Sequence, residues 1–294
     1  MDVNELAKSV VSTAEKLSAL QDSVQKCHSS LGSLWQELRA IRVTRDMELF
    51  RLLEPERYAD PKRLLQFQRQ VSSQNGEDGM IHEIFRRIGT TNRVFAEIGV
   101  GDGTENNTAF LFSQGWTGFW VDGNPRFLEK IQKLNGSSQW LKGKQALTDR
   151  DRIGAIFQEL GVPREFDLLS LDIDQNTYYL WEGLGDYHPR VVVVEYNGAL
   201  PPDVDWKVHY DPNRCWNGSQ NFGASLKAYD NLAKQRGYSL VGCDFTGINA
   251  FFVRDDAIGD HFREPFTPEN HQEPPRYSLT YRWSHGNEVL DRIK

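Results

Sequence analysis

Apolar side chains recur with a seven-residue period along the first fifty residues. The two core positions of this repeat are apolar or Cys everywhere except at Thr13. One position holds Val3, Val10, Leu17, Val24, Leu31 and Leu38, and the other holds Leu6, Thr13, Leu20, Cys27, Leu34 and Ile41. This length exceeds the three or four heptads that identify a coiled coil. We predict that residues 1–53 form a helix that joins copies of the chain, as a dimer or trimer. A helix packed on its own chain is the alternative.

Beyond residue 53 the pattern changes to short apolar runs separated by helical periodicity. The Pro-marked, charged stretch 54–73 is interpreted as a linker, and the alternation begins at about Gln74. Such alternation predicts a doubly wound α/β domain over 74–255 with a largely parallel sheet. The predicted strands are 93–98, 117–122, 140–146, 166–172, 190–195, 238–244 and 248–253. The last two are joined by a short turn, so the seventh should be antiparallel. Residues 256–294 are predicted to pack on this domain as a C-terminal extension.

Charge and composition exclude several classes of protein. The net charge is −7, from 34 basic and 41 acidic residues. This balance argues against a broad nucleic-acid surface. No apolar run approaches the roughly 20 residues of a membrane span, and the first residues do not resemble a signal peptide. The three cysteines have no disulfide or zinc spacing, so we expect a cytoplasmic protein.

A glycine-rich turn follows the first predicted strand. The segment VFAEIGVGDGTENNTAF places Glu97 at the strand end, then Gly99, Gly101 and Gly103, with a helix expected from Thr104. Glycines suit a sharp turn that approaches a ligand, and a helix start favours polar or anionic groups. The next strand ends in Asp122, where an acid accepts hydrogen bonds from ribose hydroxyls. The spacing differs from the dinucleotide-binding fingerprint.

Two short sequence motifs resemble those of a known family. SSQNGEDGMI, at residues 72–81, and FAEIGVGDG with the later WVDGNP resemble the FkbM-like and metal-dependent sugar O-methyltransferases, within the class I S-adenosylmethionine-dependent methyltransferases. The resemblance implies a seven-stranded Rossmann-like sheet and S-adenosyl-L-methionine as cofactor. The residues it assigns to the cofactor, together with neighbours at the strand ends, are Gln74, Asp78, Glu97, Gly99, Gly101, Gly103, Asn107, Asp122, Gly123, Gln145, Ala146 and Asp172. Alternatively, Asn75, Glu77 and Asp78 only cap the following helix.

Carboxylates gather at the ends of the fourth and fifth predicted strands. Asp172 and Asp174 end one strand, and Glu195 and Asn197 end the next. The carboxyl edge of a parallel sheet brings these groups together, and oxygen ligands suit Mg²⁺ or Mn²⁺. The set resembles the magnesium site of catechol-type and sugar O-methyltransferases, but its acid-x-acid and Glu-x-Asn spacings depart from that pattern. Without a metal, the acids would bind substrate hydroxyls or cap loops.

The polar loop 197–222 follows the fifth predicted strand and is interpreted as the acceptor site. The residues predicted to bind a sugar are Trp206, Tyr210, Arg214, Trp216 and Asn217. His209 is the first candidate for the catalytic base, followed by Asp174 and Lys207. The function predicted is O-methylation of a sugar or glycan hydroxyl. A metal-independent methyltransferase of small metabolites and a coiled-coil scaffold with a vestigial methyltransferase fold are the alternatives.

Overall fold

The computed structural model describes residues 2–127, 133 and 139–276. The chain divides into two compact units, Met1–Asp46 and Met47–Lys294. The long N-terminal helix is confirmed as α1 (Val3–Leu53), which forms the first unit and continues into the second. The contacts therefore divide the chain within α1, ahead of the predicted boundary at residue 53. No described helix is both long and apolar enough to cross a membrane.

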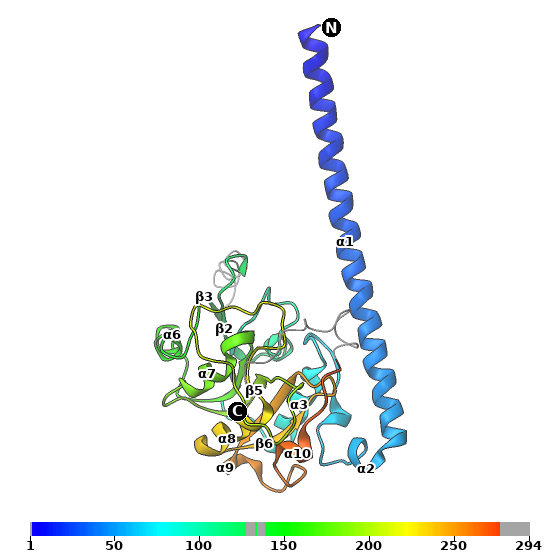
Figure 1. Ribbon diagram of the computed structural model, residues 1–294. Helices are drawn as coiled ribbons and strands as arrows, with labels where there is room; N and C mark the ends of the chain where they lie inside the picture. The colour runs from blue at the N-terminus through cyan, green and yellow to red at the C-terminus, as the bar shows by residue number, and fades with distance from the viewer. Residues whose placement is uncertain (1, 128–132, 134–138, 277–294) are drawn as a thin grey trace. The chain divides into compact units, whose positions relative to one another are not determined.

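The second unit is built on one seven-stranded sheet (Figure 1). Its strands are β1 (Val94–Ile98), β2 (Thr117–Asp122), β3 (Leu141–Gln145), β4 (Glu165–Leu171), β5 (His188–Glu195), β6 (Tyr238–Cys243) and β7 (Asn249–Arg254). The order across the sheet is β3-β2-β1-β4-β5-β7-β6, and only β7 runs against its neighbours. This is the arrangement of class I methyltransferases. The predicted fold, including the antiparallel seventh strand, is confirmed.

Helices cover both faces of the sheet because its strands are apolar on both sides. Val192 and Val194 pack on one face with α6 (Ile153–Leu160), α7 (Thr177–Glu182) and α8 (Leu226–Arg236). Val191 and Val193 pack on the other face with α3 (Glu77–Ile88) and α4 (Ala109–Ser113). Each cluster consists of buried apolar side chains, so the packing on both faces holds the strands in place. The remaining elements are α2 (Pro55–Tyr58), η1 (Leu65–Phe67), η2 (Asp174–Asn176), α9 (Asp255–Ile258) and α10 (Pro268–His271).

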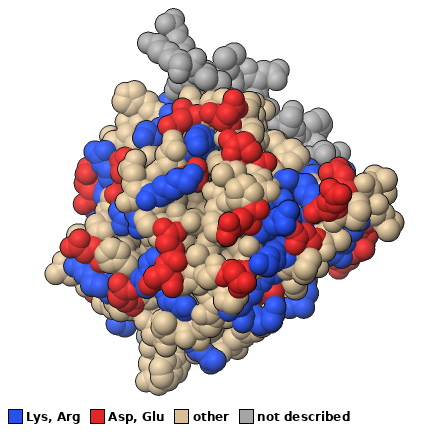
Figure 2. All heavy atoms as spheres, turned by 90° about the horizontal axis from the view of Figure 1, so that it is seen from below, with Lys and Arg blue, Asp and Glu red and all other residues tan. Residues whose placement is uncertain are grey.

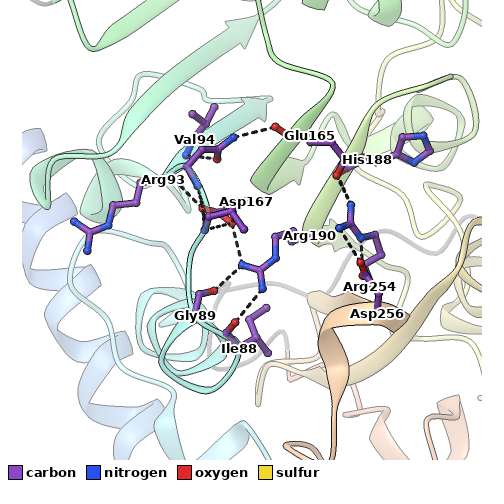
Figure 3. A network of polar contacts seen from close by, with 12 residues as sticks. Ile88, Gly89, Arg93, Val94, Glu165, Asp167, His188, Arg190, Arg254 and Asp256 are labelled. Carbon is purple, nitrogen blue, oxygen red and sulfur yellow. Dashed lines mark hydrogen bonds and ion pairs between the residues drawn. The ribbon is translucent and has the colours of Figure 1, made fainter.

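A buried ion pair organises the amino-terminal edge of the sheet (Figure 3). Asp167 is fully buried in β4 and accepts hydrogen bonds from the backbone amides of Thr91, Asn92 and Arg93. Arg190 in β5 donates to Asp167 over 3.1 Å and to the carbonyls that end α3. These bonds fix the turn that leads into β1, at the opposite end of that strand from the glycine-rich turn.

Residues on either side of the sheet domain also pack within the second unit. Tyr58, from the stretch predicted as a linker, is buried, as is Glu273 from the predicted extension. The Glu273 carboxylate accepts hydrogen bonds from Arg57 (2.7 Å), Tyr58 (2.9 Å) and Arg276 (2.9 Å). Segments more than 200 positions apart are thereby joined. Residues 277–294 lie outside the described residues, and the predicted domain boundaries remain predictions.

Basic and acidic side chains are interspersed on the face of the molecule drawn in Figure 2. Ion pairs near the protein surface include Arg254 with Asp256. Mixed charge of this kind differs from the continuous basic surface that phosphate backbones require. The mixture of basic and acidic side chains on this face is consistent with the net charge of −7.

Candidate active site

A cavity of about 370 Å³ opens at the carboxyl edge of the sheet. It is lined by the end of β1, the turn that follows, residues just before α3 and the first residue of β7. The predicted cofactor residues that line it are Gln74, Glu97, Gly99, Gly101, Asn107 and Asp172. The tertiary structure thus brings together about half of the predicted cofactor set.

Gly99 follows β1 directly, and its backbone lies against that of Asp172, which follows β4. A Cβ atom at this position would overlap the carbonyl oxygen of Asp172, and the backbone has φ = +88°. The amide of Gly99 donates to Val121 and the amide of Asp172 donates to Ile98, so three strand ends are joined here. Only glycine satisfies both the space and the backbone angle. The glycine-rich turn therefore passes directly over the end of β4.

Glu97 holds the segment after the glycines, where the sequence predicted a helix from Thr104. Its buried carboxylate accepts hydrogen bonds from the Asn106 side chain (2.6 Å) and from the amides of Asn107 (2.9 Å) and Thr108 (3.1 Å). These bonds capture amides that a helix would otherwise use. The prediction was wrong, because α4 begins only at Ala109 and has five residues. Anion binding at a helix start therefore does not apply here.

Burial has the largest effect on the electrostatics of Glu97. It raises the pKa of Glu97, whereas hydrogen bonds from Thr108, Asn106 and Asn107 act in the opposite direction. Asn107 also donates to Ser170 in β4 over 3.1 Å. Glu97 thus holds the segment after the glycine-rich turn in place and also forms part of the cavity wall.

Asp122 and its neighbours lie beside the cavity. Its carboxylate accepts hydrogen bonds from the amides of Gly101 (2.6 Å) and Asn124 (2.7 Å). Gln145 is paired with Asp122 across β2 and β3 and donates to the carbonyl of Gly123. The amide of Ala146 donates to Asp122. This group places the predicted ribose and adenine residues together, next to the glycine turn.

Asp78, at the start of α3, does not make the cofactor contact in the cavity that the resemblance implied. One oxygen of Asp78 accepts hydrogen bonds from the amides of Val71, Ser72 and Ser73, and the residue does not line the cavity. Its neighbour Glu77 lines the cavity instead. The Asp78 carboxylate thus bonds to the loop before α3, and the first residues of α3 have no side-chain cap from it, so the helix-capping alternative does not describe its contacts either.

Asn249 is a cavity residue that the sequence interpretation missed. It donates to the buried carboxylate of Glu77, which also accepts from Asn75. It stands opposite Glu195 in the register of β5 and β7, so the two side chains share one face of the sheet. The predicted antiparallel strand was the available signal, because the start of such a strand lies where parallel strands end.

Asp172, Asp174 and Glu195 form an acidic cluster. One oxygen from each lies within 4.8 Å of the others. Burial, followed by the charge of Asp174, raises the pKa of Asp172 to about 7. Burial and the charges of both aspartates raise the pKa of Glu195 well above its usual value. The cluster is therefore costly to ionise without a compensating cation.

Near this cluster, two buried oxygens have no hydrogen-bond partner among the residues that the structure describes. One is Oε2 of Glu195 and the other is the hydroxyl of Tyr229 in α8. Burial raises the pKa of Tyr229, and the nearby charges of Glu195 and Asp172 raise it further. Unpartnered buried oxygens carry a desolvation cost, so they fit a group that binds there.

Asn197 is engaged in its own loop. Its side-chain nitrogen donates to the carbonyls of Gln220 (2.8 Å) and Phe222 (3.2 Å), and its oxygen accepts from the amide of Ala199 (3.3 Å). These contacts close the base of the loop that follows β5. The side-chain amide of Asn197 is therefore already used within this loop.

Two of the three predicted catalytic bases are poorly suited to that role. Lys207 donates to the hydroxyl of Tyr178 over 3.1 Å. Burial alone would lower the pKa of Lys207, but the hydrogen bond to Tyr178 and the charge of Glu182 raise it overall, which favours the charged amine. His209 is exposed and lines neither the cavity nor the acidic cluster. Asp174 alone of the three lies in the cluster, at the unusual φ of +57°.

The predicted acceptor residues divide into buried and accessible groups. Trp206 is 7% exposed and belongs to the apolar core, so its side chain packs inside the domain. Tyr210 is half-buried between Tyr179, with ring centres 4.8 Å apart, and Arg150. Trp216 is half-buried against Phe222, and its indole nitrogen donates to Ser219. Arg214 is half-buried and Asn217 is exposed.

The charged residues that line the cavity are all acidic. The acids that line it are Glu77, Glu97, Asp102, Glu105 and Asp172, and none of its described lining residues is Lys, Arg or His. Such a wall attracts cationic ligands and repels phosphates. It therefore suits a sulfonium with an ammonium group and disfavours nucleotides that carry phosphates.

Comparison with protein-family models gave no match, and neither did comparison with curated proteins. Solved structures that resemble the chain include a putative caffeoyl-CoA O-methyltransferase from Staphylococcus aureus, at 11% identity over 71% of this chain and 91% of that chain, with a TM-score of 0.43. The CurJ carbon methyltransferase matches at 11% identity over 78% and 70%, with a TM-score of 0.41. The N-terminal domain of EvdMO1 with SAH bound matches at 12% identity over 60% and 79%, with a TM-score of 0.38.

Proposed function

We propose that the chain is an S-adenosylmethionine-dependent O-methyltransferase that acts in the cytoplasm on a sugar or glycan hydroxyl, with Mg²⁺ or Mn²⁺ at the acidic cluster. The observation that carries the proposal is the acidic cavity at the glycine-rich turn, within a class I methyltransferase sheet. A second, independent proposal is that α1 joins copies of the chain.

The fit of the cofactor is supported by backbone geometry as well as charge. The turn after β1 has positive φ at Gly99, Gly101 and Gly103, which brings the main chain close to the cavity. Asp122 lies behind Gly101, where a carboxylate would accept from ribose hydroxyls. We assign the methionine end to the cavity wall near Glu97 and the ribose to Asp122.

The fit of a divalent cation is supported by Asp172, Asp174 and Glu195. Hard cations prefer carboxylate oxygens, and Oε2 of Glu195 is buried with no hydrogen-bond partner in the described part of the chain. A bound cation would lower the pKa of an acceptor hydroxyl and orient it. These three residues would hold the cation. In the alternative arrangement Asp172 and Glu195 hold it, and Asp174 accepts the hydroxyl proton instead of binding the cation.

Alignment is the main task of the remaining residues. Methyl transfer requires the acceptor oxygen in line with the carbon–sulfur bond that breaks, and fixed geometry accounts for much of the rate. The backbones of Gly99 and Asp172 are in contact, so the glycine-rich turn and the acidic cluster have a fixed position relative to each other. Tyr210, Arg214, Trp216 and Asn217 are proposed to bind the acceptor, in keeping with the resemblance to sugar O-methyltransferases.

Titration calorimetry with S-adenosylhomocysteine tests the cofactor site. Asp122→Ala should weaken binding by about 10–100-fold, because it removes hydrogen bonds to a charged group. Asp151→Ala, an exposed acid before α6, is the matched control and should bind like the wild type. Absence of binding by the folded wild-type protein would overturn the methyltransferase proposal and favour the scaffold interpretation.

Titration with Mn²⁺ tests the acidic cluster separately. Glu195→Gln should weaken Mn²⁺ binding at least tenfold, whereas the exposed Glu159→Gln should leave it unchanged. Methyl transfer to a panel of sugars should stop when EDTA removes the cation. Activity that persists in EDTA would instead favour the metal-independent alternative.

A further inference from the structure

The heptad seam of α1 is exposed from Val10 to Ile41. Leu17, Leu20 and Leu31 are 58%, 61% and 66% exposed. The other large apolar seam residues exposed are Val10, Val24, Leu34, Leu38 and Ile41. At 1.5 Å per residue, the seam from Val10 to Ile41 is about 46 Å long. A continuous apolar stripe of this length is unstable in water unless another surface covers it.

We propose that residues 10–41 pair with the same residues of a second copy, as a parallel, in-register, two-chain coiled coil. The inference deepens the proposal that α1 joins copies of the chain, and it does not depend on the catalytic chemistry. A second copy fits because every seam position repeats with the period of 3.5 residues that knobs-into-holes packing requires.

The identity of the seam residues favours two chains. Val10 and Val24 occupy the first core position, and Leu20 and Leu34 occupy the second. β-Branched residues at the first position with Leu at the second favour dimers over larger bundles. Leu31 and Leu38 are less selective, so the valines determine the preference.

The polar and charged positions favour the parallel orientation. In register, Thr13 meets Thr13 of the partner copy, and the one polar core position is matched with itself. An antiparallel pair centred on the same seam would place Thr13 against Leu38. Parallel chains also place Glu37 beside Arg42 of the second copy, five residues on, which pairs opposite charges twice. Polar core positions and flanking charges are the features that select orientation in coiled coils.

Disulfide cross-linking tests orientation and register together. Cys27 lies near the middle of the seam, where both orientations bring two copies close, so it is replaced in a Cys27→Ser, Cys215→Ser background. Cys243 is buried, and burial raises its pKa, so it stays unreactive. Thr13→Cys should then form a covalent dimer under mild oxidation. Ser29→Cys, on the opposite side of the helix, should not.

Orientation is decided by which cysteines react. A disulfide needs Cα atoms within about 7 Å of each other. Parallel pairing predicts that Thr13→Cys cross-links alone. Cross-linking that requires Thr13→Cys together with Leu38→Cys would show antiparallel pairing and overturn the proposal.

The mass in solution tests the number of chains. Wild-type protein should sediment at twice the 33.8 kDa chain mass. Leu20→Glu with Leu34→Glu should weaken association at least about 1000-fold, because four apolar side chains leave the interface of each dimer. Gln25→Glu with Gln36→Glu adds the same charge off the seam and should remain dimeric. A monomeric or trimeric wild type would overturn the two-chain proposal.

The cofactor experiment keeps this test separate from the enzyme proposal. The Leu20→Glu, Leu34→Glu variant should bind S-adenosylhomocysteine with the wild-type affinity, because the cavity lies in residues 74–249. Loss of the dimer with retained binding supports the proposal. Retained dimer in that variant would show that another surface joins the copies and would overturn it.

Discussion

At position 99 the absence of a side chain determines where two strands can meet. The backbone of Gly99 passes against the carbonyl of Asp172, and its φ is +88°. Any Cβ atom would separate the cofactor turn from the acidic cluster. The same residue therefore governs local conformation and the geometry of the proposed site.

Gly99→Ala should lower the free energy of unfolding by about 2–4 kcal/mol, since overlap adds to an unfavourable φ. Gly154→Ala in α6 is the control, because a Cβ there meets no atom within 4 Å. It should stabilise the protein by about 0.5–1 kcal/mol. Urea unfolding of both variants measures the difference. Equal effects would contradict the close approach at Gly99.

His271 makes stability depend on pH. Burial first, and then the charge of Arg63, lowers the pKa of His271 to about 3, from the ordinary value of 6.5. The folded state thus excludes a proton that the unfolded chain binds. Above pH 6.5 this histidine does not reduce the free energy of unfolding. As the pH falls from 6.5 toward 3, the unfolded chain gains the proton, and the free energy of unfolding decreases by up to about 1.4 kcal/mol per pH unit.

His271→Gln should flatten this dependence between pH 6.5 and the acid limit of folding. The exposed His261→Gln should keep the wild-type slope. Urea unfolding at pH 7 and pH 5 compares the three proteins. A wild-type slope in His271→Gln would mean that another group accounts for the dependence.

Among the elements, β4 joins the two ends of the sheet. Its carboxyl end leads to Asp172, and its amino half contains Asp167, which holds the turn before β1. Apolar alternation predicted this strand, but not that a charged residue would be buried inside it. The charge is tolerated because Arg190 and three backbone amides surround it.

Asp167→Asn should destabilise the protein by about 2–4 kcal/mol, because it leaves Arg190 partly buried without a countercharge. Glu165→Gln, two residues earlier on the same strand, removes only an exposed pair with Arg254 and should cost less than about 1 kcal/mol. Thermal unfolding measures both. A smaller loss in Asp167→Asn than in Glu165→Gln would contradict the role assigned to Asp167.

At the scale of the whole molecule, Glu273 joins distant parts of the second unit. It is fully buried and binds Arg57, Tyr58 and Arg276. The backbone carbonyl of Glu273 also accepts from Tyr196, directly after β5. The ends of the described second unit are thus tied to the sheet edge that holds the candidate site.

Glu273→Ala should lower the free energy of unfolding by about 3–5 kcal/mol, since two arginines lose a buried partner. Glu269→Ala, exposed in α10, should change it by less than about 0.5 kcal/mol. Chemical denaturation compares the two. If both variants retain wild-type stability, the contacts of Glu273 do not hold the segments together.

Much of the architecture followed from periodicity, which is a local property. Alternating apolar runs located all seven strands to within a few residues, and the heptads located α1. The glycines and the acids at Asp172, Asp174 and Glu195 were also identified, because strand ends in a parallel sheet meet at one edge. Long-range contacts were not accessible in this way. The carboxylate of Glu97 prevented the predicted helix at Thr104, since it bonds to the amides that follow.

The sequence by itself therefore determined the element order, the sheet edge and the residue types available for chemistry. Tertiary structure alone decided which of those residues share a space. In the folded chain Asn249 and Glu77 line the cavity. His209 is exposed, and Asn197 donates a hydrogen bond within its loop. The physical reason is that periodicity records which face of an element is buried, whereas a polar side chain's partners depend on segments that folding brings from far along the chain.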